Sequence, residues 1–217
     1  MPELDFKLLG CEPAKHAAAP TLCFKLALSQ REPAVPIQNV TLQCQIRIEA
    51  RQRSYAPSEQ EGLTDLFGEP SRWGETLHSM LWVQTHVTVP PFERDCAIDV
   101  PVFCSFDFNI AATKYLHGVR DGVVPLLLLF SGSVFYRDED GQLAMDLISW
   151  NKEAQFSLPV RVWQDMMDTY YPNIAWLCVS RPVFEALYEY KRRRGYTGFD
   201  EVLTSLIPPR ENKVAAV

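Results

Sequence analysis

The chain has 217 residues, enough for one or two domains, and its 47% hydrophobic and 22% charged residues are typical of a folded soluble protein. With 21 basic and 27 acidic side chains the formal net charge is −6, which argues against non-specific nucleic-acid binding as the main task. The longest apolar run, Val123–Phe130, is much shorter than the roughly 20 residues that a membrane helix needs, so no membrane span is predicted.

The first part of the chain predicts two strands after an irregular lead-in. Met1–Lys7 lacks the basic patch and the unbroken apolar run of an export signal, so we expect a cytoplasmic protein. Residues 11–20 are predicted to be a flexible lead-in. Leu22–Leu28 and then Val40–Ile48 alternate apolar with polar residues, which is the pattern of strands that bury one face.

Residues 50–79 break the strand pattern and form the longest excursion between strands, with a short helix expected over Ser58–Phe67. Such insertions often carry function. Two further strands are predicted over Met80–Val89 and Ile98–Phe108, and one or two helical turns over Ile110–Leu116.

The stretch Val123–Trp150 is predicted to be a buried hairpin at the centre of the fold. Its first part is apolar on both faces, which is typical of a strand in the middle of a protein. The acidic residues 138–140 with Gly141 predict a tight turn, after which Leu143–Trp150 returns as the second strand.

A last strand is predicted over Ala154–Val160, and the apolar period then changes from two to 3.6 residues. Three amphipathic helices are therefore expected in the last quarter of the chain. The first runs from Val160 to Pro172, the second lies between Ser180 and Gly195, and the third starts at the capping-box-like pattern Thr197-x-x-Asp200.

About seven strands followed by three helices predict a mainly β member of the α+β class. We expect an antiparallel β-sandwich or open barrel with the C-terminal amphipathic helices packed on it. The strands and helices do not alternate as they do in nucleotide-binding sheets. One domain is expected over 1–217, with a β-rich part at 20–160, a helical part at 160–207 and a flexible tail at 208–217.

Candidate chemistry is sparse. The six cysteines and four histidines show no spacing typical of zinc or redox sites, so we predict no metal, no cofactor and no catalytic residue from motifs. Cys44 and Cys104 are in phase with apolar neighbours and are predicted to lie in the core. Metal handling through Cys11, Cys96 or the histidines is an open alternative. A hydrolytic site assembled in space would be tested first at His86, Asp107 and Ser105.

Two sets of residues are candidates for binding a partner. Four large aromatic residues cluster in the excursion and the strand after it, where they either fill the core or form an exposed interface: Phe67, Trp73, Trp82 and Phe92. Arg192 and Arg193 belong to the basic cluster Lys191–Arg194, which could meet an acidic partner. Its position in the last helical turn, with Glu189 four residues before Arg193, favours helix stabilisation instead.

Four segments together resemble an uncharacterised bacterial family whose members are single-domain proteins of about this length: Asp65–Trp73, Leu81–Trp82, Pro125–Gly132 and Trp163–Asp168. Members of that family have no assigned activity and occur near genes for actinobacterial-type nickel–iron hydrogenases. The resemblance therefore implies an accessory or maturation role by association.

The sequence favours a non-catalytic accessory or assembly protein that binds a partner polypeptide, and the resemblance makes a nickel–iron hydrogenase component one such partner. The alternative is an enzyme or small-molecule binder with a spatially assembled polar site. Neither nucleic acid nor a membrane is expected as a partner, and a homo-oligomer is compatible with the sequence.

Overall fold

The computed structural model describes residues 2–31, 35–105, 110–175 and 177–208. The chain divides into two compact units, Met1–Ile174 and Ala175–Val217, which are described separately. The predicted tail at 208–217 lies outside the described residues except for Pro208. The expectation of one domain stays a prediction.

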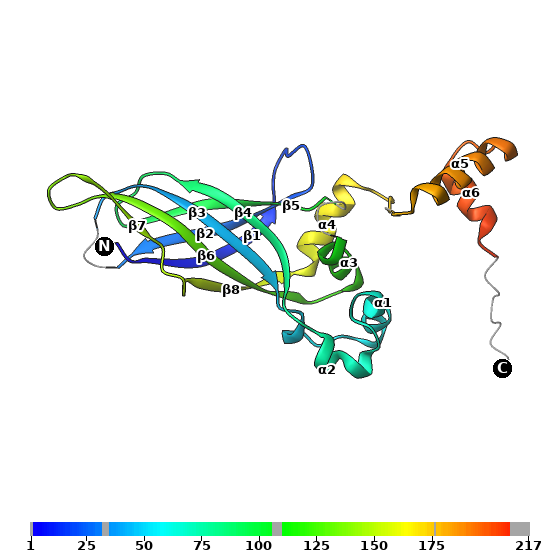
Figure 1. Cartoon of the computed structure of the whole chain (residues 1–217), viewed down its shortest axis with the longest axis horizontal. Helices are drawn as coiled ribbons and strands as arrows, with labels where there is room; N and C mark the ends of the chain where they lie inside the picture. The colour runs from blue at the N-terminus through cyan, green and yellow to red at the C-terminus, as the bar shows by residue number, and fades with distance from the viewer. Residues whose placement is uncertain (1, 32–34, 106–109, 176, 209–217) are drawn as a thin grey trace. The chain divides into compact units, whose positions relative to one another are not determined.

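The described residues form eight strands and six α-helices with two short 3-10 turns (Figure 1). The strands are β1 Leu4–Pro13, β2 Thr21–Gln30, β3 Ile37–Ile48, β4 Met80–Val89, β5 Asp95–Phe103, β6 Val123–Arg137, β7 Leu143–Leu147 and β8 Glu153–Pro159. The helices are α1 Pro57–Phe67, α2 Trp73–Thr76, α3 Ile110–Gly118, α4 Val160–Tyr170, α5 Arg181–Arg194 and α6 Phe199–Leu206, with 3-10 turns η1 Ala50–Gln52 and η2 Pro70–Arg72. The predicted α+β class is confirmed.

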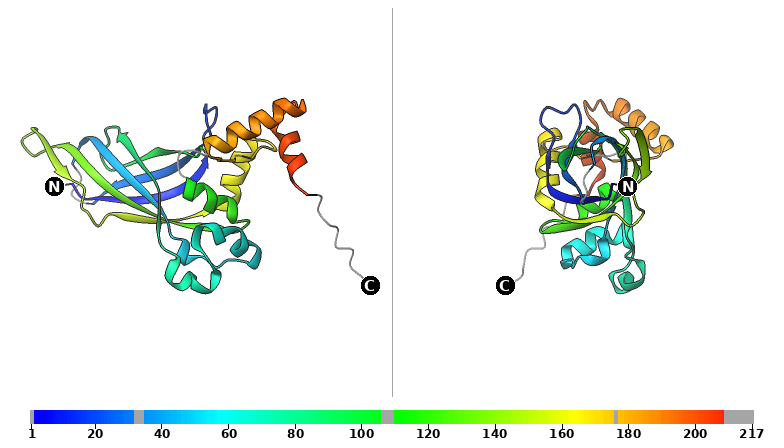
Figure 2. Two further views of the ribbon diagram at one scale, coloured as in Figure 1. Left: turned by 45° about the vertical axis from the view of Figure 1, so that its right-hand side comes forward. Right: turned by 90° about the vertical axis from the view of Figure 1, so that its left-hand side faces the viewer.

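The strands of the first unit form two antiparallel sheets. One has the order β1-β2-β5, and the other has the order β4-β3-β6 with β7 and β8 both paired to the remaining edge of β6. β8 pairs with the first half of β6, up to Leu129, and β7 pairs with the second half, from Ser133. Contacts between β1 and β8 and between β4 and β5 bring the sheet edges together, so that the strands surround the interior when viewed end-on (Figure 2).

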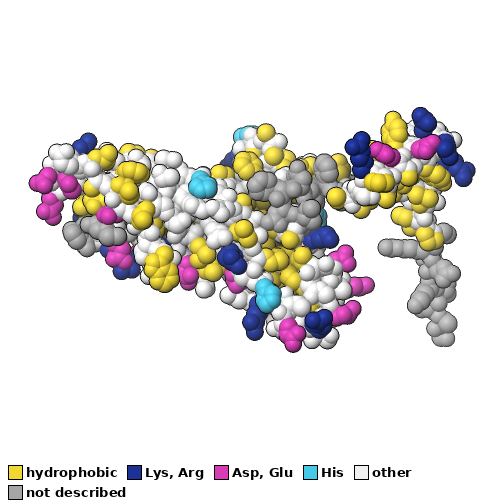
Figure 3. Space-filling view, viewed as in Figure 1, with side chains coloured by type: hydrophobic (Ala, Val, Ile, Leu, Met, Phe, Trp, Pro, Cys, Tyr) yellow, Lys and Arg dark blue, Asp and Glu magenta, His cyan; other side chains and the backbone are white. Residues whose placement is uncertain are grey.

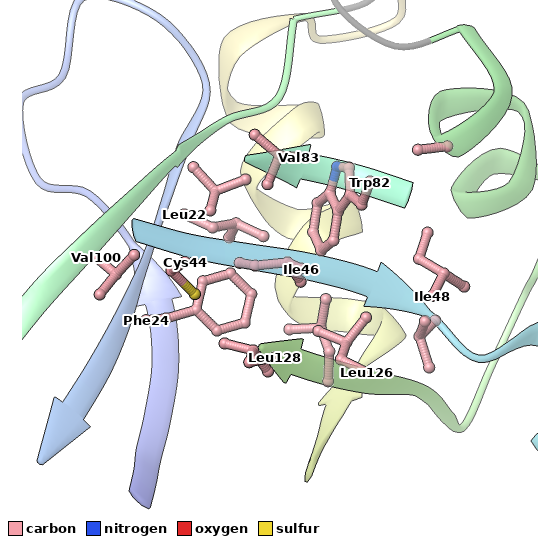
Figure 4. Packing of buried hydrophobic residues seen from close by; sticks show 14 of the residues in the cluster. Leu22, Phe24, Cys44, Ile46, Ile48, Trp82, Val83, Val100, Leu126 and Leu128 are labelled. Atoms are coloured by element: carbon pink, nitrogen blue, oxygen red, sulfur yellow. The ribbon is translucent and has the colours of Figure 1, made fainter. Parts of the chain in front are cut away.

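The core lies between the two sheets, where the inward side chains interlock (Figure 4). The alternation predicted for Val40–Ile48 is confirmed, because its five apolar residues are fully buried: Val40, Leu42, Cys44, Ile46 and Ile48. Phe24 of the smaller sheet and Leu128 of the larger sheet meet in this layer. The predicted core positions of Cys44 and Cys104 are also confirmed.

One strand was not predicted. β1 covers Leu4–Pro13, so the interpretation of residues 11–20 as a flexible lead-in is wrong for its first three residues. β1 pairs along the whole of β2, but its register shifts between Leu8 and Gly10. This bulge interrupts the alternation that Leu4, Phe6 and Leu8 begin, and the regular pattern that identifies a strand in sequence is lost there.

The helix predicted from Val160 is α4, and its apolar side is buried as expected at Val160, Trp163, Met166 and Met167. It contacts β1 and β8 and lies with α3 at one end of the sheets (Figure 1). The rings of Trp163 and His117 join α4 to α3, with centroids 4.9 Å apart. The tyrosine at the end of α4, Tyr170, donates a hydrogen bond to the Ala17 carbonyl at 2.8 Å.

The second unit contains α5 and α6, which contact each other. The rings of Phe184 and Phe199 lie 5.6 Å apart, and Val202 of α6 is buried. α5 ends at Gly195, as predicted, with the left-handed backbone that glycine favours. The cap of α6 differs from the prediction, because the carboxylate that accepts the Thr197 backbone and hydroxyl hydrogen bonds belongs to Glu201 and not to Asp200.

Candidate partner-binding surface

The four aromatic residues proposed from the sequence as a partner surface are buried. Phe67, Trp73, Trp82 and Phe92 retain between 5% and 9% of their exposed area. Trp73 folds back so that its indole Nε1 donates to the Gly68 carbonyl at 2.8 Å, and its ring contacts Phe67 with centroids 5.8 Å apart. These side chains fill the core, as in the first of the two alternatives that the sequence left open. A role of the four residues in partner binding stays a prediction.

The buried rings of the excursion pack around two tyrosines that the sequence analysis did not single out. The hydroxyls of Tyr55 and Tyr115 lie 2.9 Å apart, and the Tyr55 hydroxyl donates to the Ala50 carbonyl at 2.7 Å. Tyr115 is fully buried, and burial raises the pKa of both phenols, which keeps them protonated. The cluster has hydrogen-bonded hydroxyls inside an apolar shell, which is the arrangement of structural tyrosines.

Arg192 and Arg193 lie in the last turn of α5 and are exposed. The Arg193 guanidinium donates to the Glu189 carboxylate at 2.7 Å, which is the helix-stabilising pair expected from the sequence. A role of these arginines in partner binding stays a prediction.

The structure describes only two of the three residues proposed for a spatially assembled hydrolytic site. His86 lies exposed on the outer face of β4, opposite Gln43 of β3, and Ser105 follows β5. Asp107, the third member of the proposed trio, lies outside the described residues. The assembled hydrolytic site therefore stays a prediction.

A hollow of about 410 Å³ lies elsewhere, among η1, the start of α1 and the loop before β6. An ion pair shapes its wall, because Arg53 Nη2 donates to Glu59 Oε1 at 2.6 Å with both side chains more than nine-tenths buried. Glu59 also accepts the backbone N–H groups of Arg120 and Ala56. Arg53 donates in addition to the carbonyls of Val123 and Asp121. These bonds join three segments of chain, but within the described residues the buried Arg53 Nε has no hydrogen-bond partner.

Among the described residues of the first unit, exposed large apolar side chains follow one another closely in and just after β7. Leu143, Met145 and Leu147 remain 65%, 53% and 66% exposed, and Trp150, just beyond the strand, is 92% exposed. We call these four residues the β7 surface. The sequence predicted a buried hairpin here, and that prediction is wrong for its second strand.

The register with β6 explains why these residues face outward. Asp146 is opposite the buried Val134, whereas Met145 is opposite the half-buried Phe135, so the two faces of β7 are fixed by its partner. The Tyr136 hydroxyl donates to Asp146 at 2.7 Å on the inner face. Ala144 and Asp146 thus lie on the side of β7 that faces the interior, and its large apolar side chains face outward.

The backbone of the same three residues is open on the side away from β6. The Ile148 N–H bonds to the Gly132 carbonyl at 2.9 Å at one end of the hairpin, and the Asp138 N–H bonds to Gln142 at 3.0 Å at the other. Bonded and non-bonded pairs alternate along antiparallel strands, so Leu143, Met145 and Leu147 direct their N–H and C=O groups away from β6. Within the described residues no strand pairs with that edge.

The turn that precedes β7 carries three exposed acidic residues, Asp138, Glu139 and Asp140. Gly141 adopts a positive φ, and the Asp138 carboxylate accepts the N–H groups of Asp140 and Gln142, which confirms the predicted turn. Figure 3 shows acidic side chains gathered at this tip with hydrophobic side chains beside it. The apolar edge strand therefore has a negatively charged end.

Comparison with known families places this chain in one of them. Residues 1–215 match the model described as "Family of unknown function (DUF6084)". The chain belongs to this family. No curated protein matches it.

One solved structure that matches this DUF6084 protein is a selenomethionine-labelled β-glucosidase from Kluyveromyces marxianus. The identity is 7% and the TM-score 0.26, over 72% of this chain and 15% of that one. The chain thus spans a small part of that enzyme, and the likeness supports no statement about activity.

The thiols of this DUF6084 protein offer no assembled chemistry among the residues that the structure describes. All six cysteines are free, and no group of three His, Cys, Asp or Glu side chains lies close enough to hold a metal ion. Burial raises the pKa of Cys11, Cys44 and Cys104 to about 12 in each case. In the part of the chain that the structure describes, every helix is too short or too polar to span a lipid bilayer.

Proposed function

We propose that this protein is a non-catalytic accessory or assembly protein that holds a partner polypeptide on the β7 surface. The observation that supports this is the outward apolar face of an edge strand, where Leu143, Met145 and Leu147 are exposed, with Trp150 exposed just beyond the strand. The summed exposed area of the four side chains is on the order of 500 Å², and exposed apolar patches of a few hundred Å² on a monomer are often functional.

Covering this area with a partner would be favourable. At about 25 cal/mol per Å² the gross gain is on the order of 12 kcal/mol, and the loss of translational and rotational freedom on association removes about 4–15 kcal/mol of it. The β7 surface alone thus supports weak or moderate binding. Backbone hydrogen bonds or charge pairs are needed for a tight complex.

The resemblance drawn from the sequence makes a component of a nickel–iron hydrogenase the first partner to test. The experiment is purification of the tagged full-length protein from its native host, with partners quantified by mass spectrometry. The variant Leu147→Lys with Trp150→Ser places a charge on the surface and removes its most exposed ring. The matched control is Leu9→Lys, because Leu9 of β1 is also 57% exposed.

The proposal predicts one polypeptide in stoichiometric amount with the natural protein and with the Leu9→Lys control, and its loss from the double variant. A protein that purifies alone, or a partner retained equally by the double variant, contradicts the proposal. A partner outside the hydrogenase system leaves polypeptide binding intact and removes the hydrogenase association.

A further inference from the structure

The open edge of β7 restricts the kind of chain that can bind there. Three N–H and three C=O groups are spaced along the edge at every second residue, in Leu143, Met145 and Leu147. Only an extended backbone presents complementary groups at the same spacing. A helix would satisfy its own backbone groups and leave those of β7 to water.

We propose, resting on the function proposed above, that β7 binds an extended segment of the partner as an additional antiparallel strand. The segment has apolar side chains at every second residue, followed toward its C-terminus by lysine or arginine. Residues opposite each other in an antiparallel pair share a face, so the partner residues opposite Leu143, Met145 and Leu147 lie beside exposed apolar side chains. This requirement gives the apolar alternation.

The acidic turn before β7 is the reason to expect basic residues in the partner segment, and its place in the hairpin indicates where in that segment they lie. Asp138, Glu139 and Asp140 lie at the N-terminal end of β7, with Arg137 as the one cation next to them in the chain. A strand antiparallel to β7 passes this turn with its C-terminal end. All six strand pairings among the described residues are antiparallel, and antiparallel pairing is slightly more stable per residue.

A second copy of this chain is a poorer occupant of the same edge. A self-pair centred on Met145 would set residues 150–152 of one copy beside the acidic turn of the other. The cation in that stretch, Lys152, is already bonded to Glu3 and Asp5 at 3.2 and 3.0 Å and is only 14% exposed. Self-pairing thus leaves the acidic turn without a free cation, which a partner with C-terminal basic residues supplies.

The test uses the full-length protein and a fluorescent peptide of sequence Ser-Val-Thr-Val-Ser-Val-Gly-Lys-Lys, with binding measured by anisotropy. The comparison peptides are the reversed sequence and a version N-methylated on the three valines, which cannot donate to β7. On the protein, Met145→Pro removes one outward N–H and leaves the bonds to β6 in place, as edge strands tolerate. Leu9→Lys is the control.

The proposal predicts that reversal, N-methylation and Met145→Pro each weaken binding at least tenfold, and that Leu9→Lys leaves it unchanged. The double variant Glu139→Lys with Asp140→Lys should lose the preference for C-terminal basic residues. Equal affinity for the reversed peptide overturns the assigned direction. Binding that is insensitive to both N-methylation and Met145→Pro overturns strand addition.

Two outcomes separate this inference from the proposed function. If the host partner depends on Leu147 and Trp150 but no peptide binds, strand addition is overturned while polypeptide binding stands. A dimer in sedimentation velocity that Met145→Pro abolishes also overturns the inference, because the occupant is then a second copy.

Discussion

Gly132 lies at the point where β6 passes from its pairing with β8 to its pairing with β7, and substituting it tests the architecture of the larger sheet. Its φ is +135°, which side chains rarely adopt. A Cβ at this position would lie 1.9 Å from the carbonyl oxygen of Thr41 in the neighbouring β3. The atom it meets is backbone, so Gly132→Ala must move the central strands β3 and β6 apart.

The expected loss of stability combines two effects. Backbone strain at such a φ costs on the order of 1–3 kcal/mol, and forcing one extra carbon into a packed site costs about 1–3 kcal/mol more. We therefore expect Gly132→Ala to reduce the free energy of unfolding by about 3–5 kcal/mol. For a chain of this size that corresponds to a fall in Tm of roughly 10 °C.

Urea unfolding followed by far-ultraviolet circular dichroism measures this loss. The matched control is Gly10→Ala in β1, where a Cβ would meet no atom within 4 Å, and where we expect a change below about 1 kcal/mol. A Gly132→Ala variant as stable as the Gly10→Ala variant would refute the close approach of β3 to β6.

Three further predictions concern groups placed by the structure. Burial opposes ionisation of Glu59, but its hydrogen bonds and Arg53 hold the pKa of this carboxyl below the ordinary value of 4.5. The charged carboxylate therefore stabilises the fold fully above pH 4.5. This contribution to the free energy of unfolding is lost as the pH falls through the lower pKa of the folded protein. Glu59→Gln should cost about 3–5 kcal/mol at pH 7 and flatten the acid dependence of unfolding between about pH 5 and 3. With a thiol reagent at pH 8, the exposed Cys178 should react in the native protein and Cys44 only after unfolding. Trp73→Phe should lower stability by about 1–3 kcal/mol through its lost bond to a carbonyl, whereas Trp150→Phe should not change it.

Local patterns were enough to predict the class of the fold. The alternation of Val40–Ile48 and the 3.6-residue period that begins at Val160 each describe one element burying one face, and both were confirmed. β1 was missed because its bulge near Gly10 breaks the alternation. Elements were thus predictable where their periodicity is uninterrupted.

The candidate surface could not be predicted, because it depends on how two strands align. The sequence Leu143–Leu147 shows that one face is apolar, but only the pairing of Asp146 with Val134 decides that this face points outward. The reverse holds for Trp73, whose burial depends on the return of the chain to Gly68. In both cases the sequence shows that the side chains are apolar, but contacts with distant parts of the chain decide whether they are buried or exposed.

Amide hydrogen exchange of β7 in the full-length protein, free and with the valine–lysine peptide, tests the central claim most directly. In the free protein we predict fast exchange of the backbone amides of Leu143, Met145 and Leu147. The amides of Ala144 and Asp146 should exchange slowly, because their N–H groups point toward β6. On peptide binding the three fast amides should become protected. Protection of these amides in the free protein, or their continued fast exchange in the complex, would contradict the account.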